Sequence, residues 1–165
     1  MIYFEKRAAR ADGRVFLIVN QPESIFFDAN VYINLLKSPL YERKVEIFLP
    51  GAYLYVINKI VLMELWAGVS NKTEENILKK HQHMMPMIGL SDDNFIVAGQ
   101  IMNHMRRFSQ HEPKMRRRLT WDILMALSAK ENNALLLTEN KKDFEQIKNF
   151  LGFEFMTVGD AQSPR

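Results

Sequence analysis

The sequence predicts an α/β fold: a three-layer sandwich in which a mainly parallel central sheet is flanked by helices. From residue 25 onward, short apolar runs alternate with helical patterns, which is typical of parallel strands joined by crossover helices. The run Ala134, Leu135, Leu136 and Leu137 has no polar interruption, as expected of a strand buried on both faces. At 165 residues, the chain has the length of one domain with a substantial core.

The expected elements follow in order. Residues 1–24 form an N-terminal extension, with a possible hairpin between 2–4 and 15–19 around a turn at 11–14. The main domain is expected to span residues 25–165. Strands are expected at 25–27, 53–57, 87–90, 134–137 and 153–158. Helices are expected at 31–37, 39–49, 60–67, 72–83, 91–107, 120–131 and from residue 143, with a loop at 109–118. The expected helix caps are Ser38, Asn58, either Asn71 or Thr73, and Thr120.

Composition excludes several classes of protein. The chain has no cysteine, which excludes disulfides, thiolate catalysis and cysteine-based zinc sites, and agrees with a reducing compartment. No segment reaches membrane-spanning length, and the apolar run at 15–19 is too short for a secretion signal. We therefore expect a cytoplasmic protein that does not associate with membranes.

Four acidic residues adjoin the apolar runs. Asp28 ends the first strand of the main domain, Asp122 lies in the first turn of the predicted helix 120–131, and Asp143 follows the strand 134–137. Strand ends and helix starts of a parallel sheet face the same edge, so these three acids are expected to converge there. The helix N-terminus alone would also favour an anion at Asp122.

Glu64 lies within a predicted helix whose neighbours Met63, Leu65 and Trp66 indicate burial. A buried charge is costly, so this carboxyl must be protonated, paired with a base or bound to a cation. Carboxylates about 4 Å apart repel by roughly 4 kcal/mol at an effective dielectric near 20. A cluster of such acids therefore requires protons or a metal, and hard oxygen ligands select Mg²⁺ or Mn²⁺ over zinc.

Positive charge is concentrated in one segment. Residues 104–118 carry a net charge of +5, whereas the whole chain carries +3. Such a patch favours nucleic acid as a partner, although a solvated loop or an acidic protein partner would also explain it. The side chains expected to hold a nucleic-acid backbone are Arg106, Arg107, Arg116, Arg117, Arg118, Lys141 and Lys142. Trp121 is expected to pack, although its position beside Asp122 also suits stacking on a base.

Three segments together resemble the PIN domain family and, within it, the VapC-type ribonuclease toxins. They read FFDANVYINLL, INKIVLMELWAGV and LTWDILMALSAKENNALLLTENKKDF. The resemblance runs from residue 25 to about residue 155. It implies a metal-dependent nuclease acting on RNA, together with homodimerisation and inhibition by a cognate antitoxin.

The resemblance also assigns site residues. It implies that Asp28, Glu64 and Asp122 are metal-binding catalytic acids, and that Asp143 or Asn140 fills the fourth position. Asn30, Thr138 and Asn140 are expected to orient the carboxylates. The predicted function is a Mg²⁺- or Mn²⁺-dependent endoribonuclease, and the resemblance implies that it is the toxin of a toxin–antitoxin pair. The alternatives are a catalytically weak or inactive module that binds RNA or protein, and a receiver-like phosphoacceptor domain, which usually has adjacent acids where this chain has Asp28, Ala29 and Asn30.

Overall fold

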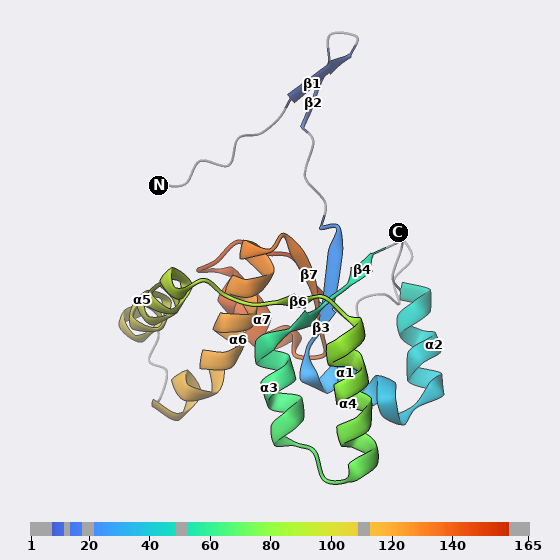
Figure 1. The fold of residues 1–165 in the computed structure, drawn as a ribbon. Helices are drawn as coiled ribbons and strands as arrows, with labels where there is room; N and C mark the ends of the chain where they lie inside the picture. The colour runs from blue at the N-terminus through green and yellow to red at the C-terminus, as the bar shows by residue number, and fades with distance from the viewer. Residues whose placement is uncertain (1–7, 12–13, 18–21, 49–52, 109–112, 159–165) are drawn as a thin grey trace.

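The computed structural model describes residues 8–11, 14–17, 22–48, 53–108 and 113–158, and it contains a four-stranded parallel sheet in the order β4-β3-β7-β8 (Figure 1). The strands are β3 (Ser24–Phe27), β4 (Leu54–Tyr55), β7 (Ala134–Thr138) and β8 (Phe155–Thr157). Each neighbouring pair is parallel. The predicted fold class is confirmed, and the expected strand 153–158 is the edge strand β8.

Helices cover both faces of this sheet. Successive side chains of a strand point to opposite faces. Ile25, Leu135 and Leu137 therefore pack with residues of α1 (Ala29–Lys37) and α2 (Pro39–Phe48), whereas Phe26 and Leu136 belong to the larger core on the other face. That core also contains residues of α3 (Lys59–Ala67), α5 (Asp92–Phe108), α6 (Pro113–Glu131) and α7 (Lys141–Lys148). Figure 1 shows α2 on one side of the sheet and α5 and α6 on the other.

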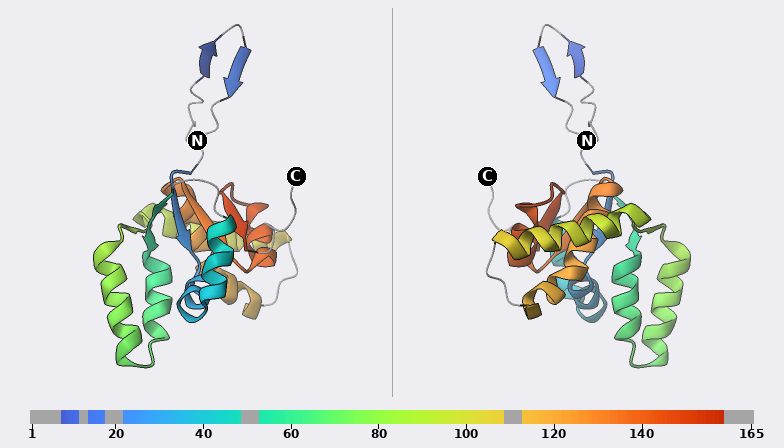
Figure 2. Two further views of the ribbon diagram at one scale, coloured as in Figure 1. Left: turned by 90° about the vertical axis from the view of Figure 1, so that its right-hand side faces the viewer. Right: turned by 90° about the vertical axis from the view of Figure 1, so that its left-hand side faces the viewer.

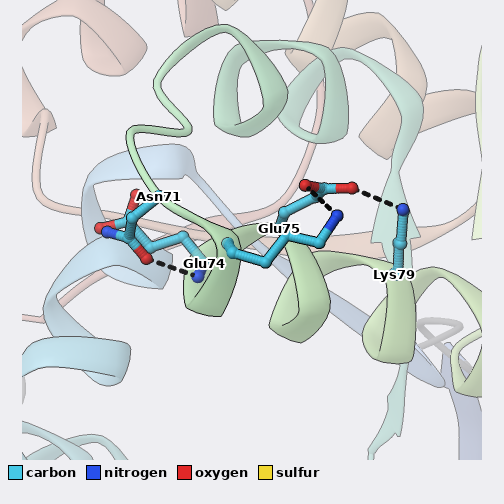
Figure 3. Close-up of polar contacts among 5 residues, drawn as sticks. Asn71, Glu74, Glu75 and Lys79 are labelled. Carbon is cyan, nitrogen blue, oxygen red and sulfur yellow. Dashed lines mark hydrogen bonds and ion pairs between the residues drawn. The ribbon is translucent and has the colours of Figure 1, made fainter.

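Helices α3 and α4 (Lys72–Met84) form an antiparallel pair, visible at the edge of both views in Figure 2. Asn71 rather than Thr73 caps α4, accepting a hydrogen bond of 3.0 Å from the amide of Glu74 (Figure 3). Glu75 forms ion pairs with Lys72 and Lys79, and its hydrogen bonds to these two lysines lower its pKa to about 2. These contacts lie on the solvated side of α4, while its Leu78 packs into the larger core.

The prediction of one strand at 53–57 is wrong, because this segment forms two short strands that belong to different sheets. β4 pairs with β3, and the amide of Val56 still donates to the carbonyl of Ile25 at 3.0 Å. The next amide, that of Ile57, donates instead to the carbonyl of Pro86 at 2.9 Å. From there β5 (Ile57–Asn58) pairs with β6 (Met87–Ile88), which lies within the expected strand 87–90.

The start of α6 also differs from the prediction. The segment 113–118 was expected to be loop and Thr120 to be a helix cap, but α6 is continuous from Pro113 to Glu131. Proline is favoured at the first helical position, and the following residues Lys, Met and Arg are good helix formers. Leu119, which directly precedes Thr120, is buried in the larger core, so packing as well as helix propensity favours a helix that begins before Thr120.

The N-terminal residues include a two-stranded antiparallel sheet of β1 (Ala8–Ala11) and β2 (Arg14–Leu17). The two strands flank the expected turn, whereas the arm expected at 2–4 lies outside the described residues. Within the described ranges, no helix combines the length and hydropathy that crossing a membrane requires.

Candidate functional site

The first acid is held where β3 meets α1. The backbone amide of Asp28 donates to the carbonyl of Leu137 at 2.9 Å, which continues the pairing of β3 with β7 beyond the end of the strand. Its carboxylate Oδ2 accepts hydrogen bonds from Asn30 Nδ2 at 2.8 Å and from Thr138 Oγ1 at 2.7 Å. Burial raises the pKa of Asp28, and the bond from Thr138 is the largest of the hydrogen bonds that oppose this rise. Asp28 is therefore a buried acid oriented by two neighbours.

Glu64 reaches the same region from α3. Its side chain is half-buried, and its pKa is raised first by burial and then by the negative charge of Asp28. The negative charge of Asp28 therefore acts on the carboxyl of Glu64. The expected burial of this helix holds for Leu65 and is wrong for Met63, which is 45% exposed. Asp28 and Glu64 thus form a pair whose repulsion a proton or a cation would relieve.

Asp122 and Asp143 are connected by the side-chain amide of Asn140. Asn140 Nδ2 lies 2.9 Å from Asp143 Oδ2 and 3.4 Å from Asp122 Oδ2. Asp143 lies in the first turn of α7 and is 4% exposed. Because α6 begins at Pro113, Asp122 lies well inside that helix, so the expectation of a first-turn acid is wrong. The charge at the helix N-terminus therefore does not explain Asp122, since its effect falls off within one turn.

Thr138 joins the two groups of acids. It is the last residue of β7 and is fully buried. Its hydroxyl donates to Asp28 and accepts a hydrogen bond of 2.9 Å from the backbone amide of Asn140. A chain of contacts therefore runs from Asp28 through Thr138 and Asn140 to Asp122 and Asp143.

Glu139 was not among the predicted site residues. Its carboxylate accepts hydrogen bonds from the hydroxyl of Tyr41 at 2.6 Å and from Asn34 Nδ2 at 3.1 Å, and its amide donates to Asn30 Oδ1 at 3.4 Å. These contacts fix the turn after β7 to α1 and α2. Burial, followed by the contact with Glu139, raises the pKa of Tyr41, and the charge of Glu139 contributes to the raised pKa of Asp28. Sequence carries no signal for this contact because the partners are 98 and 105 residues apart.

The side chains at this site are of the kind that binds a hard divalent cation. Carboxylate oxygens predominate, and burial raises the pKa of Asp28 and of Glu64, so a bound cation would offset the cost of keeping these two carboxylates charged. The acids nevertheless form two pairs. Among the residues that the structure describes, no three carboxylate or imidazole groups form a ready-made metal cluster.

The predicted RNA-binding residues are only partly described. Arg106 is exposed on α5, with its guanidinium 3.1 Å from Asn103 Oδ1, and Lys141 and Lys142 are exposed at the start of α7. The side chains of Arg107, Arg116, Arg117 and Arg118 lie outside the described set. Trp121 was expected to pack but is 42% exposed, next to Asp122 on α6.

The fold and this site define a class of α/β proteins with acidic residues at the carboxyl edge of a parallel sheet. Within this class, residues 25–149 match the model of the PIN domain family, and the chain therefore belongs to that family. No curated protein sequence matches the chain significantly.

Solved structures of similar fold come from toxin–antitoxin systems. VapBC2 from Rickettsia felis, bound to a DNA fragment from their promoter, contains a chain with 22% identity and a TM-score of 0.60, covering 81% of this chain and 97% of that one. VapBC-1 from nontypeable Haemophilus influenzae gives 18% identity and a TM-score of 0.58, with the same coverage. DNA-bound VapBC from Salmonella typhimurium contains a chain with 20% identity and a TM-score of 0.57, covering 82% of this chain and 98% of that one. The predicted resemblance to PIN domains of the VapC type is confirmed at the level of fold.

Proposed function

We propose that this PIN-domain protein is an endoribonuclease that hydrolyses RNA phosphodiesters with the help of Mg²⁺ or Mn²⁺. The observation that carries the proposal is the contact chain from Asp28 through Thr138 and Asn140 to Asp122 and Asp143, with Glu64 beside Asp28. Acids held together against their mutual repulsion, at the carboxyl edge of a parallel sheet, are the arrangement expected of a functional site.

Each residue has a defined role in this proposal. Asp28, Glu64, Asp122 and Asp143 would hold the cation, which when bound supplies Lewis acidity toward water and phosphate oxygens. Asn30 and Thr138 orient Asp28, because both donate to the same carboxylate oxygen, Oδ2. Glu139 fixes the turn that carries Asn140.

Basic residues near the acids would bind the RNA backbone. Lys141 and Lys142 are exposed two and one residues before Asp143, and Arg106 is exposed on α5. Each phosphate contact releases counterions from the nucleic acid, so the affinity for RNA should fall as salt is added. The arginines of segment 113–118 belong to α6, the helix that carries Asp122.

The solved structures suggest partners as well. They include VapBC and FitAB assemblies and a toxin–antitoxin complex from Klebsiella pneumoniae. We propose by analogy that this protein is the toxin of such a pair, that it forms a homodimer, that a cognate antitoxin inhibits it, and that it acts in the cytoplasm. Co-expression with the product of an adjacent small gene, followed by co-purification and loss of ribonuclease activity, would test the partner.

The test of activity is cleavage of RNA by the purified protein with Mn²⁺ or Mg²⁺. EDTA and the variant Asp28→Asn should each abolish cleavage. The matched control is Asp93→Asn, which removes the same charge from an exposed position in the first turn of α5 and should leave cleavage intact. Cleavage that survives both EDTA and Asp28→Asn would overturn the proposed mechanism.

A second candidate function is a binding module without catalysis. It is favoured by one observation, namely that Asn140 directs an amide nitrogen at both Asp122 and Asp143. Salt-sensitive RNA binding by the metal-supplied protein, without any cleavage, would support this second function over the first.

A further inference from the structure

The amide of Asn140 occupies an unusual electrostatic position. One nitrogen, Nδ2, faces Asp143 Oδ2 at 2.9 Å and Asp122 Oδ2 at 3.4 Å, so a single NH₂ group serves two acids from different helices. Both acids belong to the set proposed to bind the cation. An NH₂ group has two donor hydrogens and a partial positive charge, which suits it to bridge two carboxylates.

This contact is not a helix cap. Asn140 precedes α7, yet its side chain makes no capping hydrogen bond to that helix. Its place before the helix is fixed by the backbone, whose amide donates to Thr138 Oγ1 at 2.9 Å. The side chain is therefore committed to the two carboxylates, and shortening it should leave both the helix start and the link to Thr138 in place.

A cation between Asp122 and Asp143 would oppose this arrangement. The carboxylate oxygens that accept from Asn140 are the kind of oxygens that a divalent cation requires, and the donor hydrogens of the amide would face a like charge. For the cation to bind, the NH₂ group must withdraw and its hydrogen bonds to the acids must break.

We propose that Asn140 is a positioning residue that substitutes for the cation in the metal-free protein. Its amide holds Asp122 and Asp143 together until a cation displaces it, and thereby weakens metal binding by stabilising the metal-free state. This inference rests on the proposed metal-dependent function. It differs from the expectation that Asn140 fills the fourth position as a metal ligand, and the two predict opposite effects of removing the amide.

The decisive variant is Asn140→Ala, studied by calorimetric titration with Mn²⁺ alone. Removing the amide destabilises the metal-free state while leaving the metal-bound state almost unchanged, so Mn²⁺ should bind about tenfold more tightly than to wild type. The Mn²⁺-induced rise in melting temperature, relative to EDTA, should also be larger. If Asn140→Ala binds Mn²⁺ as wild type does, the inference is wrong. If the variant binds Mn²⁺ more weakly, the inference is also wrong and an amide oxygen ligand is favoured.

The matched control is Asn132→Ala. The amide nitrogen of Asn132 also bridges two oxygens, the carbonyls of Gly89 and Ser128, each at 2.9 Å. Its loss should lower the melting temperature equally with Mn²⁺ and with EDTA and leave the affinity for Mn²⁺ unchanged. A gain in affinity in this control as well would show that the effect is general destabilisation and would overturn the inference.

A measurement on the wild-type protein avoids dependence on folding of the variants. With ¹⁵N-labelled asparagine, the side-chain NH₂ resonances of Asn140 should shift as Mg²⁺ is added, while those of Asn132 should stay in place. If the protein binds Mg²⁺ but the Asn140 resonances do not change, the inference is wrong and the proposed metal-dependent function still stands. Absence of any Mn²⁺ or Mg²⁺ binding by wild type would overturn the proposed metal-dependent function together with it.

Discussion

The hydroxyl of Thr138 offers the sharpest test of how the site is held together. Thr138→Val keeps the shape of this fully buried side chain but removes two hydrogen bonds. One is donated to Asp28 Oδ2 at 2.7 Å, and the other is accepted from the backbone amide of Asn140 at 2.9 Å. A hydrogen bond to a charged group contributes about 1.5 to 3 kcal/mol, and leaving a fully buried amide without its acceptor costs about 1 to 3 kcal/mol, which is an upper limit for the part-buried backbone amide of Asn140. We expect a loss of about 3 kcal/mol in the free energy of unfolding at neutral pH.

The loss should depend on pH. The pKa of Asp28 is raised by burial, and the bond from Thr138 opposes that rise, so the pKa should be higher still in Thr138→Val. A carboxyl whose folded pKa exceeds its unfolded value favours folding below the unfolded pKa, and this contribution is lost as pH rises through the folded pKa. The difference between variant and wild type should therefore be large at neutral pH and shrink in acid, where Asp28 is protonated.

Urea unfolding of the metal-free protein at roughly pH 7.5 and roughly pH 4 measures this difference. At neutral pH the melting temperature should fall by about 6 to 12 °C, given about 2 to 4 °C per kcal/mol for a domain of this size. Ser128→Ala is the control, because this fully buried hydroxyl joins Asn58 to the carbonyl of Gly89 and has no ionisable group in those two contacts. An equal loss at both pH values for Thr138→Val would refute the reasoning.

Three further predictions concern other parts of the site and its surroundings. Asp28→Asn should raise the free energy of unfolding of the metal-free protein at neutral pH by about 1 kcal/mol, because it removes the negative charge of a carboxyl whose pKa is raised by burial. Urea titrations measure this change, and a less stable variant would contradict the prediction. Trp121→Ala should weaken the binding of single-stranded RNA by about fivefold to a hundredfold, because Trp121 is 42% exposed beside Asp122 and can stack on a base. Fluorescence anisotropy in EDTA measures this affinity, whose dependence on salt should not change. An unchanged affinity would exclude stacking. Burial lowers the pKa of His81, whose Nδ1 contacts the hydroxyl of Tyr32, so its contribution to stability is lost as pH falls through the unfolded pKa. Accordingly, His81→Gln should lose less stability than wild type between about pH 7 and about pH 5 in urea titrations, and parallel losses would argue against this role.

Local sequence identified most of the elements because their signals are local. Asn58 and Asn71 cap helices with their own side chains, and Gly68 ends α3. The parallel strands at Ser24–Phe27 and Ala134–Thr138 are mainly apolar, and their side chains pack into the cores on both faces of the sheet. The acids Asp28 and Asp143 were found for the same reason, since each follows a buried strand closely.

Local patterns misplaced elements whose limits depend on distant partners. The segment 53–57 has one continuous strand pattern, but the chain changes partners from Ile25 to Pro86 at Ile57. Thr120 has the residue type of a cap, but packing of Leu119 and the preceding helix formers extend α6 to Pro113. In both cases contacts distant in sequence decided between local alternatives.

The sequence by itself determined the layered α/β fold, the succession of most strands and helices along the chain, and the acids that follow the buried strands. These follow from hydrophobic periodicity and from residue types at strand ends, which act over a few positions. Only the tertiary structure decided how the acids are partnered. Thr138 connects Asp28 to Asn140, whose amide bridges Asp122 and Asp143, across separations of up to 110 residues. Hydrogen bonding and charge repulsion depend on distance in space, so this arrangement exists only once the sheet has formed.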